Sequence, residues 1–338
     1  MAVSTVPKWY GIDVSKASFD VAVHQQGGRK VQHHKFSRTR QGCRECLSWI
    51  DKCLPAGHHP ALVMEATGGY GKEMALWLLD LRAGLHVAVA QPVRVHYFAK
   101  GLGRMNKTDA QDAIMLARFG EVHTPSSYQP MSPAYEQLRA LGRERAAMVK
   151  EAHRQGNRNE IPSGSPIAQS VREQLITHLE GAIAKLEKAM TDVIAGDPQL
   201  KMDYRRLQTV PGVGPIVAAV LMGELGDLRD YPSPKALAAF TGIAPALVDS
   251  GTSVHQTAHM TKHGSGRVRQ VLYLGAMGAV RGKNPLSRSY HHLVASGKPE
   301  MVALGAVMRK ILACSRAVLV SEQDFDLAYI RKQQEPES

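Results

Sequence analysis

The chain has 338 residues, of which 44% are hydrophobic, so it is long enough for two domains with a sizeable core. Its 42 basic and 30 acidic residues leave a net charge of +12, which favours a polyanionic partner such as nucleic acid. No apolar run approaches the roughly 20 residues that span a bilayer, and the first residues lack the apolar segment of a signal peptide. We therefore expect no membrane partner and a cytoplasmic protein.

An apolar segment near the N-terminus carries a single acid. Asp13 lies within Tyr10-Gly11-Ile12-Asp13-Val14, where a buried carboxylate requires a metal ion, a cation or hydrogen bonds. Residues 17–23 and 29–36 alternate like two further strands, with a turn at 26–28 between them. Asp13 would then begin an antiparallel meander. The alternative is a solvent-facing acid at a strand end, and further acids must decide between the two.

The pattern after the meander alternates between helix and buried strand. Residues 40–54 have helical periodicity, and the cysteines among them fall on the apolar face rather than in a zinc site. Residues 60–65 form a continuous apolar run, typical of a strand buried on both faces, that ends in Glu65. A helix to residue 81 and a buried strand over 85–90 follow. The order β-β-β-α-β-α-β resembles the ribonuclease-H fold, and Glu65 ends its strand where open α/β sheets bind ligands.

A third group of acids lies at the start of a predicted helix. The capping-box pattern over residues 108–111 starts this helix, so Asp109 and Asp112 lie on one of its faces. Acids in a first turn can also simply complement the helix dipole. Together with Asp13 and Glu65, however, they form a set of oxygen ligands that suits Mg²⁺ or Mn²⁺. A pair of such ions can stabilise both the attacking and the leaving oxygen at a phosphodiester.

Two long helices are predicted after the acidic region. A basic helix covers about residues 132–160, proline and glycine interrupt it, and a second helix covers about residues 170–195. The two predict a helical hairpin. The apolar stripe of the second helix fits packing within the chain or a coiled coil between protomers. The arginines of the first helix could be solvated or could lie along phosphates.

The chain beyond residue 198 is predicted to form a mainly helical domain. Pro211-Gly212-Val213-Gly214 leads into an apolar helix and resembles a helix-hairpin-helix turn, which presents backbone N–H groups to a DNA phosphate. Its alternative is a tight structural turn. Further helices are expected over residues 233–241, 266–280 and 302–320.

A polar segment between these helices combines a hydroxyl group with cations. Ser250 precedes a glycine, and Lys262, Arg267 and Arg269 follow it. A serine hydroxyl in such a place could attack phosphorus. The alternative is a loop serine or a helix cap, and no general base lies nearby in the sequence.

These motifs together resemble the DEDD-type insertion-sequence transposases that are guided by a bridge RNA. The resemblance spans nearly the whole chain and is carried by Gly11-Ile12-Asp13, Met64-Glu65-Ala66-Thr67-Gly68, Asn106-Lys107-Thr108-Asp109-Ala110-Gln111-Asp112-Ala113, Pro211-Gly212-Val213-Gly214, Ser250-Gly251, Lys262-His263-Gly264 and Arg269. It implies an α/β RuvC-like domain with the RNase H fold over residues 1–128. A helical coiled-coil linker over 129–198 and a mainly α-helical transposase domain over 199–330 would follow.

The resemblance also implies a chemistry. Asp13, Glu65, Asp109 and Asp112 would bind Mg²⁺ or Mn²⁺, and Ser250 would attack DNA to form a 5′-phosphoserine link. The family's composite site joins the acids of one protomer to the serine of another. The implied function is the excision and insertion of a mobile element by strand exchange.

The implied partners are donor and target DNA, a structured non-coding guide RNA, and further copies of the chain in a dimer or tetramer. The expected nucleic-acid contacts are Gly212, Gly214, Lys262, Arg267 and Arg269. The family often has arginine where His255 and His259 stand, so phosphate contacts would be weaker there. One alternative is a RuvC-like junction resolvase that uses the same acids with water. Another is an RNA-binding architectural protein with a degenerate site.

Overall fold

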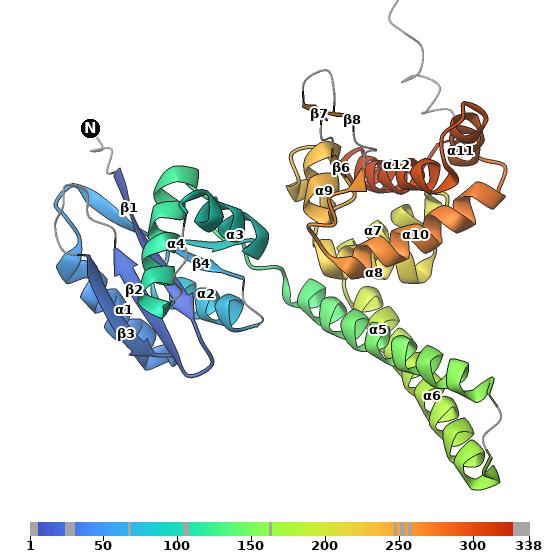
Figure 1. Cartoon of the computed structure of the whole chain (residues 1–338), viewed down its shortest axis with the longest axis horizontal. Helices are drawn as coiled ribbons and strands as arrows, with labels where there is room; N and C mark the ends of the chain where they lie inside the picture. Colours follow the sequence, from blue (N-terminus) through green and yellow to red (C-terminus); the bar gives the residue numbers. More distant parts are fainter. Residues whose placement is uncertain are drawn as a thin grey trace, which may run out of the picture. The chain divides into compact units, whose positions relative to one another are not determined.

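The computed structural model describes residues 6–23, 31–66, 69–103, 108–161, 164–246, 249–250, 254–255 and 259–326. Of residues 246, 249–250 and 254–255 only the backbone is described, and the turn predicted at 26–28 lies outside the described residues. The chain divides into two compact units, residues 1–130 (unit 1) and residues 131–338 (unit 2) (Figure 1). Within the part of the chain that the structure describes, no helix is long and apolar enough to cross a membrane.

Unit 1 is built on a mixed five-stranded sheet in the order β3-β2-β1-β4-β5. Its strands are β1 (Val6–Val14), β2 (Ser18–Val23), β3 (Gln32–Ser37), β4 (His58–Glu65) and β5 (His86–Ala90). The first three strands form an antiparallel meander, whereas β1, β4 and β5 run parallel. The predicted order of strands and helices as far as residue 90 is confirmed, and this sheet is consistent with an RNase H-like domain.

Helices cover both faces of this sheet. The helices of unit 1 are α1 (Arg40–Cys53), α2 (Tyr70–Leu81), α3 (Pro92–Gly101) and α4 (Asp109–His123) (Figure 1). Tyr10 and Ile12 of β1 face the core shared with α1 and α2, which also contains the fully buried Cys43 and Cys46. Trp9, on the opposite side of the same strand, packs into a second core with residues of α3 and α4. The alternation of β1 therefore separates two apolar layers.

The helix α4 lies unusually close to the middle of the sheet, over Gly11. A Cβ atom on Gly11 would lie 2.0 Å from the carbonyl oxygen of Ala113 and 2.3 Å from the backbone nitrogen of Ala117. No side chain fits in that space. The glycine therefore allows α4 to pack directly on β1 through Ala113 and Ala117, in its second and third turns, and this contact positions the acids at the start of the helix that are discussed below.

Unit 2 begins with a helical hairpin formed by α5 (Pro133–Asn159) and α6 (Pro166–Gly196), which pack along each other (Figure 1). The predicted start of α6 at about residue 170 was four residues late. The helix begins at Pro166, because Ser165 accepts a hydrogen bond from the N–H of Ala168 and proline is well suited to the first helical position.

The rest of unit 2 is a helical bundle with very short strands. Its elements are α7 (Pro198–Thr209), α8 (Pro215–Leu225), the 3₁₀ helix η1 (Leu228–Asp230), α9 (Pro234–Thr241), β6 (Pro245–Ala246), β7 (Asp249–Ser250), β8 (Val254–His255), β9 (His259–Met260), α10 (Gly266–Arg281), α11 (Pro285–Ala295) and α12 (Glu300–Val320). The last helix, α12, packs against α7, α9, α10 and α11. It thus lies at the centre of the core of unit 2.

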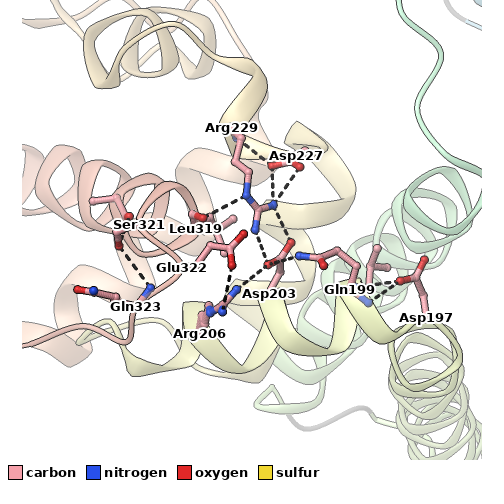
Figure 2. Close-up of polar contacts among 12 residues, drawn as sticks. Asp197, Gln199, Asp203, Arg206, Asp227, Arg229, Leu319, Ser321, Glu322 and Gln323 are labelled. Atoms are coloured by element: carbon pink, nitrogen blue, oxygen red, sulfur yellow. Dashed lines mark hydrogen bonds and ion pairs between the residues drawn. The ribbon is translucent and has the colours of Figure 1, made fainter.

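A buried polar network joins α7, η1 and the end of α12 (Figure 2). Asp203 is fully buried, and the guanidinium of Arg229 donates to both of its carboxylate oxygens at 2.6 and 2.8 Å. Arg229 also donates to Asp227 and, through its Nε, to the carbonyl oxygen of Leu319 at 3.1 Å. A buried carboxylate is tolerated here because a bidentate arginine compensates its charge.

Candidate active site beneath the first turn of α4

Two acids lie side by side at the carboxyl ends of adjacent parallel strands. Ile12 of β1 lies opposite Met64 of β4 in the parallel register, so Asp13 and Glu65 follow that pair directly. The alternation of β1 places Asp13 on the same face as Trp9 and Gly11, which is the face covered by α4. Both acids are half-buried. This edge of the sheet is where open α/β proteins hold ligands.

The first turn of α4 brings two more acids to this edge. Thr108 caps the helix by accepting a hydrogen bond from the N–H of Gln111 at 3.3 Å, so the predicted start at Asp109 is confirmed. Asp109 is exposed and Asp112 is half-buried. Since α4 packs against β1, β2 and β4, its first turn adds its acids to those of the strands.

The electrostatics of Asp13 show that these acids form one group. The pKa of Asp13 is raised from its usual 3.8 to about 6, first by burial and then by the charges of Asp112, Asp109, Asp20 and Glu65, in that order of effect. All four predicted acids therefore contribute to, or respond to, the same negative potential. We call Asp13, Glu65, Asp109 and Asp112 the acid cluster.

Sequence reasoning missed two charged neighbours of the acid cluster, Asp20 and Lys35. Asp20 is buried on β2 directly opposite Asp13, and Lys35 of β3 lies directly opposite Asp20. The Nζ atom of Lys35 is 3.4 Å from Oδ2 of Asp20 and 3.7 Å from Oδ2 of Asp109. The Nε2 atom of His33 lies 2.7 Å from Oδ1 of Asp20. The sequence offered only one signal for these neighbours, an acid in the second strand of the meander. The pairing of the three strands could not be read from the sequence, so the position of this acid was unknown.

The donor set of the acid cluster fits a hard divalent cation. It consists of carboxylate oxygens, which suit Mg²⁺ and Mn²⁺, and the raised pKa of Asp13, caused by burial and neighbouring acids, marks a surplus of negative charge. Among the residues that the structure describes, no three acids, histidines or cysteines converge closely enough to form a ready-made metal site. The side chains would therefore have to move together to coordinate an ion.

The predicted serine lies in unit 2, at the start of a short hairpin. The backbone of Ser250 pairs with Val254 between β7 and β8. Its side chain, together with Gly251 and the neighbouring hydroxyls of Thr252 and Ser253, lies outside the described residues. The same holds for the side chain of His255.

The two glycines of the predicted DNA-binding turn have different roles. Gly212 has a φ of +88°, and a Cβ atom there would lie 2.3 Å from the carbonyl oxygen of Gly275 in α10. The structural alternative for this glycine is therefore supported. Gly214 caps the N-terminus of α8, is exposed and has open space around it, so it remains a candidate phosphate contact.

The predicted cations near α10 are also unequal. Arg269 is half-buried and donates from Nη1 to the carbonyl oxygens of Gly264 and Thr241, so it holds the turn before α10. Arg267 is exposed, with Nη1 3.7 Å from Oε1 of Glu224, and Lys262 is exposed with a φ of +57°. Of these three cations, only Arg267 and Lys262 present their charge mainly to solvent.

Several arginines of α5 have partners within unit 2. Arg143 binds Glu224 at 2.9 Å, and Arg145 binds Glu187 at 2.7 Å. Arg139 is buried and donates to the carbonyl oxygen of Gly223 at 2.9 Å. The basic character of this helix is thus partly used for folding, which neither of the two alternatives for its arginines anticipated.

Comparisons with known proteins match both units. Residues 10–160 match a family model for the DEDD transposase domain of IS110, described as "Transposase". Residues 204–292 match a model described as "Transposase IS116/IS110/IS902 family". Pilin gene-inverting proteins of Moraxella lacunata and Moraxella bovis are each 30% identical over 323 residues, which cover 94% of this chain and 97% of the relative. The transposase for insertion sequence element IS1328 of Yersinia enterocolitica is 25% identical over 290 residues, covering 78% and 80% respectively.

These matches define an enzyme that acts on DNA in transposition or recombination. The chain belongs to the IS116/IS110/IS902 family of transposases. The DEDD type of the N-terminal match suggests dependence on a divalent metal ion, for which the acid cluster supplies the candidate ligands.

Proposed function

We propose that this protein is a DNA recombinase that excises and inserts its own mobile element by strand exchange. Strand cleavage uses Mg²⁺ or Mn²⁺ at the acid cluster and Ser250 as the nucleophile, and a guide RNA selects the DNA sites. The observation that carries the proposal is the acid cluster itself, with Asp13 at its centre and its pKa raised to about 6 by burial and by the neighbouring acids. Such a cluster at the strand ends suits metal-dependent phosphodiester chemistry.

The residues of the acid cluster have one common task in this mechanism. They would hold the metal ions, and bound ions would supply Lewis-acid stabilisation of the charge that develops at the scissile phosphate. Asp13 and Glu65 are fixed by the strands, whereas Asp109 and Asp112 come from the start of α4. The carboxylates act only when ionised, so Asp13 must lose the proton that its raised pKa favours.

The role of Ser250 rests on the resemblance and on the logic of strand exchange. Attack by the serine hydroxyl on phosphorus expels the 3′ oxygen of the cut strand and leaves a 5′-phosphoserine ester. The reverse attack by a 3′ hydroxyl of a new partner strand restores a phosphodiester without an external energy source. The name of the Moraxella relatives describes inversion of a gene, and inversion requires that every cut strand be rejoined.

The guide RNA and the oligomer complete the proposal. A net charge of +12 suits a protein that binds both DNA and RNA. If base pairing selects the site, few side chains need to read base edges, as in other RNA-guided proteins. We propose that at least two protomers act together, so that the acid cluster of one serves the serine of another.

A trapping experiment tests the serine step. Wild-type protein, a DNA substrate carrying the element's junction, the RNA encoded beside the gene and Mg²⁺ are mixed and then denatured. We expect a covalent protein–DNA adduct whose modified peptide contains Ser250. Ser250→Ala should abolish the adduct and strand exchange, whereas the matched controls Thr252→Val and Ser253→Ala should retain both.

The same experiment separates the proposal from its main alternative. A metal-dependent resolvase would cleave with water, so Ser250→Ala would still cut the DNA and no adduct would form with the wild type. That result, or an adduct on another residue, would overturn the serine mechanism. Omission of the RNA tests guidance separately, because a protein that reads the site by itself would retain the reaction.

A further inference from the structure

Three charged residues lie in a row across the meander, on the face covered by α4. Lys35 of β3 is directly opposite Asp20 of β2, which is directly opposite Asp13 of β1. Directly opposite residues of antiparallel strands point to the same face, so the row leads from Lys35 to the acid cluster. Lys35 also reaches Asp109 of α4, with its Nζ 3.7 Å from Oδ2.

Asp20 is held on both of its carboxylate oxygens. Oδ1 is 2.7 Å from Nε2 of His33, and Oδ2 is 3.4 Å from Nζ of Lys35. Asp20 is also only 5% exposed. Asp20 is thus contacted by two side chains of β3, and it helps to hold the ammonium of Lys35 beside the acid cluster.

Lys35 supplies positive charge where the acid cluster has a surplus of negative charge. An ammonium within 4 Å of two carboxylates offsets part of their mutual repulsion. It also forms an ion pair with one oxygen of Asp109, and Asp109 is one of the metal ligands in the proposed function. A divalent cation that recruits Asp109 must therefore compete with Lys35, which agrees with the lack of a ready-made metal site among the described side chains.

We propose that Lys35 is the resident counter-ion of the acid cluster, and that Asp109 exchanges Lys35 for the divalent cation when the metal binds. Lys35 is in this sense a positioning residue that sets the metal affinity. The inference rests on the proposed function only in that the acid cluster binds a metal. It holds with or without the serine step.

The inference predicts two effects of opposite sign for Lys35→Met. Without metal, the acid cluster loses its counter-ion, so unit 1 should unfold at a lower urea concentration in EDTA. With metal, a repelling positive charge is gone, so Mn²⁺ should bind about 3- to 30-fold more tightly, the range for one screened unit charge beside a divalent ion. Lys35→Arg keeps the charge and should behave like the wild type in both measurements.

The probe is Mn²⁺ alone, titrated into the full chain without nucleic acid, with free Mn²⁺ measured by electron paramagnetic resonance. Lys52→Met is the matched control, because it removes an exposed lysine from α1, which covers the opposite face of the sheet. Asp13→Asn is the control for the acid cluster. Far-UV circular dichroism checks that each variant is folded, and Lys35→Gln serves as a second uncharged variant.

The outcomes separate this inference from the proposed function. If the wild type binds no Mn²⁺, or Asp13→Asn binds it equally well, the metal role of the acid cluster fails. If Mn²⁺ binding depends on Asp13 but Lys35→Met and Lys35→Gln bind it as the wild type does or more weakly, the counter-ion role of Lys35 alone is refuted. Tighter binding by Lys52→Met as well would mean that overall charge, not the position of Lys35, causes the effect.

Discussion

Replacing Asp13 by asparagine should stabilise unit 1 at neutral pH while abolishing DNA cleavage. The reason is that the ionised carboxylate of Asp13 destabilises the folded state of unit 1. Burial, and after it the charges of the neighbouring acids, together raise its pKa from the usual 3.8 to about 6. Asparagine keeps nearly the same shape and can still accept and donate hydrogen bonds, but it removes the charge.

The magnitude follows from the pKa shift. A shift of about two units at about 1.4 kcal/mol per unit gives an upper value of about 3 kcal/mol. Because Asp13 is only half-buried, solvent screening reduces this to about 1–2 kcal/mol. The stability of unit 1 should fall as the pH rises, because Asp13 binds its proton more tightly in the folded state than in the unfolded state. The stability that the proton provides is fully present below about pH 4 and is lost as the pH rises to about 6.

The assay can follow unit 1 by itself, because all three tryptophans of the chain, Trp9, Trp49 and Trp77, lie in it. Urea unfolding is monitored by tryptophan fluorescence at pH 4 to 8 in EDTA. The advantage of Asp13→Asn should be small at pH 4 and should reach its full size above pH 6. Glu45→Gln, at an exposed acid on α1, is the matched control and should show no such trend.

Addition of Mg²⁺ should make the wild type more stable than Asp13→Asn. The metal ion would offset the repulsion among the acids of the wild type, whereas the variant lacks one of the metal ligands. Binding of DNA should remain close to that of the wild type, because basic residues hold the polyanion. If Asp13→Asn were less stable than the wild type at pH 8 in EDTA, or if the difference were independent of pH, the electrostatic account of the acid cluster would be wrong.

Three further outcomes are expected. Arg229→Met should destabilise unit 2 by about 3–5 kcal/mol in urea unfolding followed by circular dichroism, because it leaves Asp203 buried without its bidentate partner. Gly11→Ala should destabilise unit 1 by about 1–3 kcal/mol or more in the fluorescence assay, because its Cβ would overlap the carbonyl oxygen of Ala113. Duplex DNA affinity should fall with rising salt, with log K decreasing by about 0.9 per tenfold salt increase for each phosphate neutralised.

The two stability predictions each have a control variant that would expose a wrong cause. Arg145→Met removes a partly exposed ion pair with Glu187 and should cost less than about 1 kcal/mol. Gly69→Ala adds a methyl group in open space before α2 and should change the stability little. If either control matched its test variant, burial or close packing would not be the cause. An affinity that did not depend on salt would contradict the polyanion interpretation of the net charge.

The acids of the site were predictable because each is marked by its own local sequence. Asp13 interrupts one apolar strand, Glu65 ends another, and the cap at Thr108 fixes where α4 begins. Asp20 and Lys35 were not predictable, because their positions depend on the register of two hairpins. A shift of one residue would have turned them to the other face of the sheet.

Three helices, α3, α7 and α11, were missed for a different reason. Pro92 was read as the end of a strand, but it occupies the first turn of α3, where its missing N–H costs nothing. The signal for α11 was present in Asn284-Pro285, since Asn284 caps the helix with its side chain. The ion pair between Arg143 and Glu224 joins residues 81 positions apart, and no local pattern reveals such a pair.

The central position of α12 has a consequence for the order in which the protein is made. Unit 1 is complete once residue 130 has been synthesised, so it can fold while the ribosome is still translating the rest. Unit 2 cannot close its core until residues 300–320 have emerged, and the backbone N–H of Phe325 still has to reach the hydroxyl of Thr209. We therefore expect the nascent chain to carry a folded acid cluster before it carries a folded serine-bearing unit. A fragment released early would contain the candidate metal ligands but would lack the serine to which the proposed function assigns strand exchange.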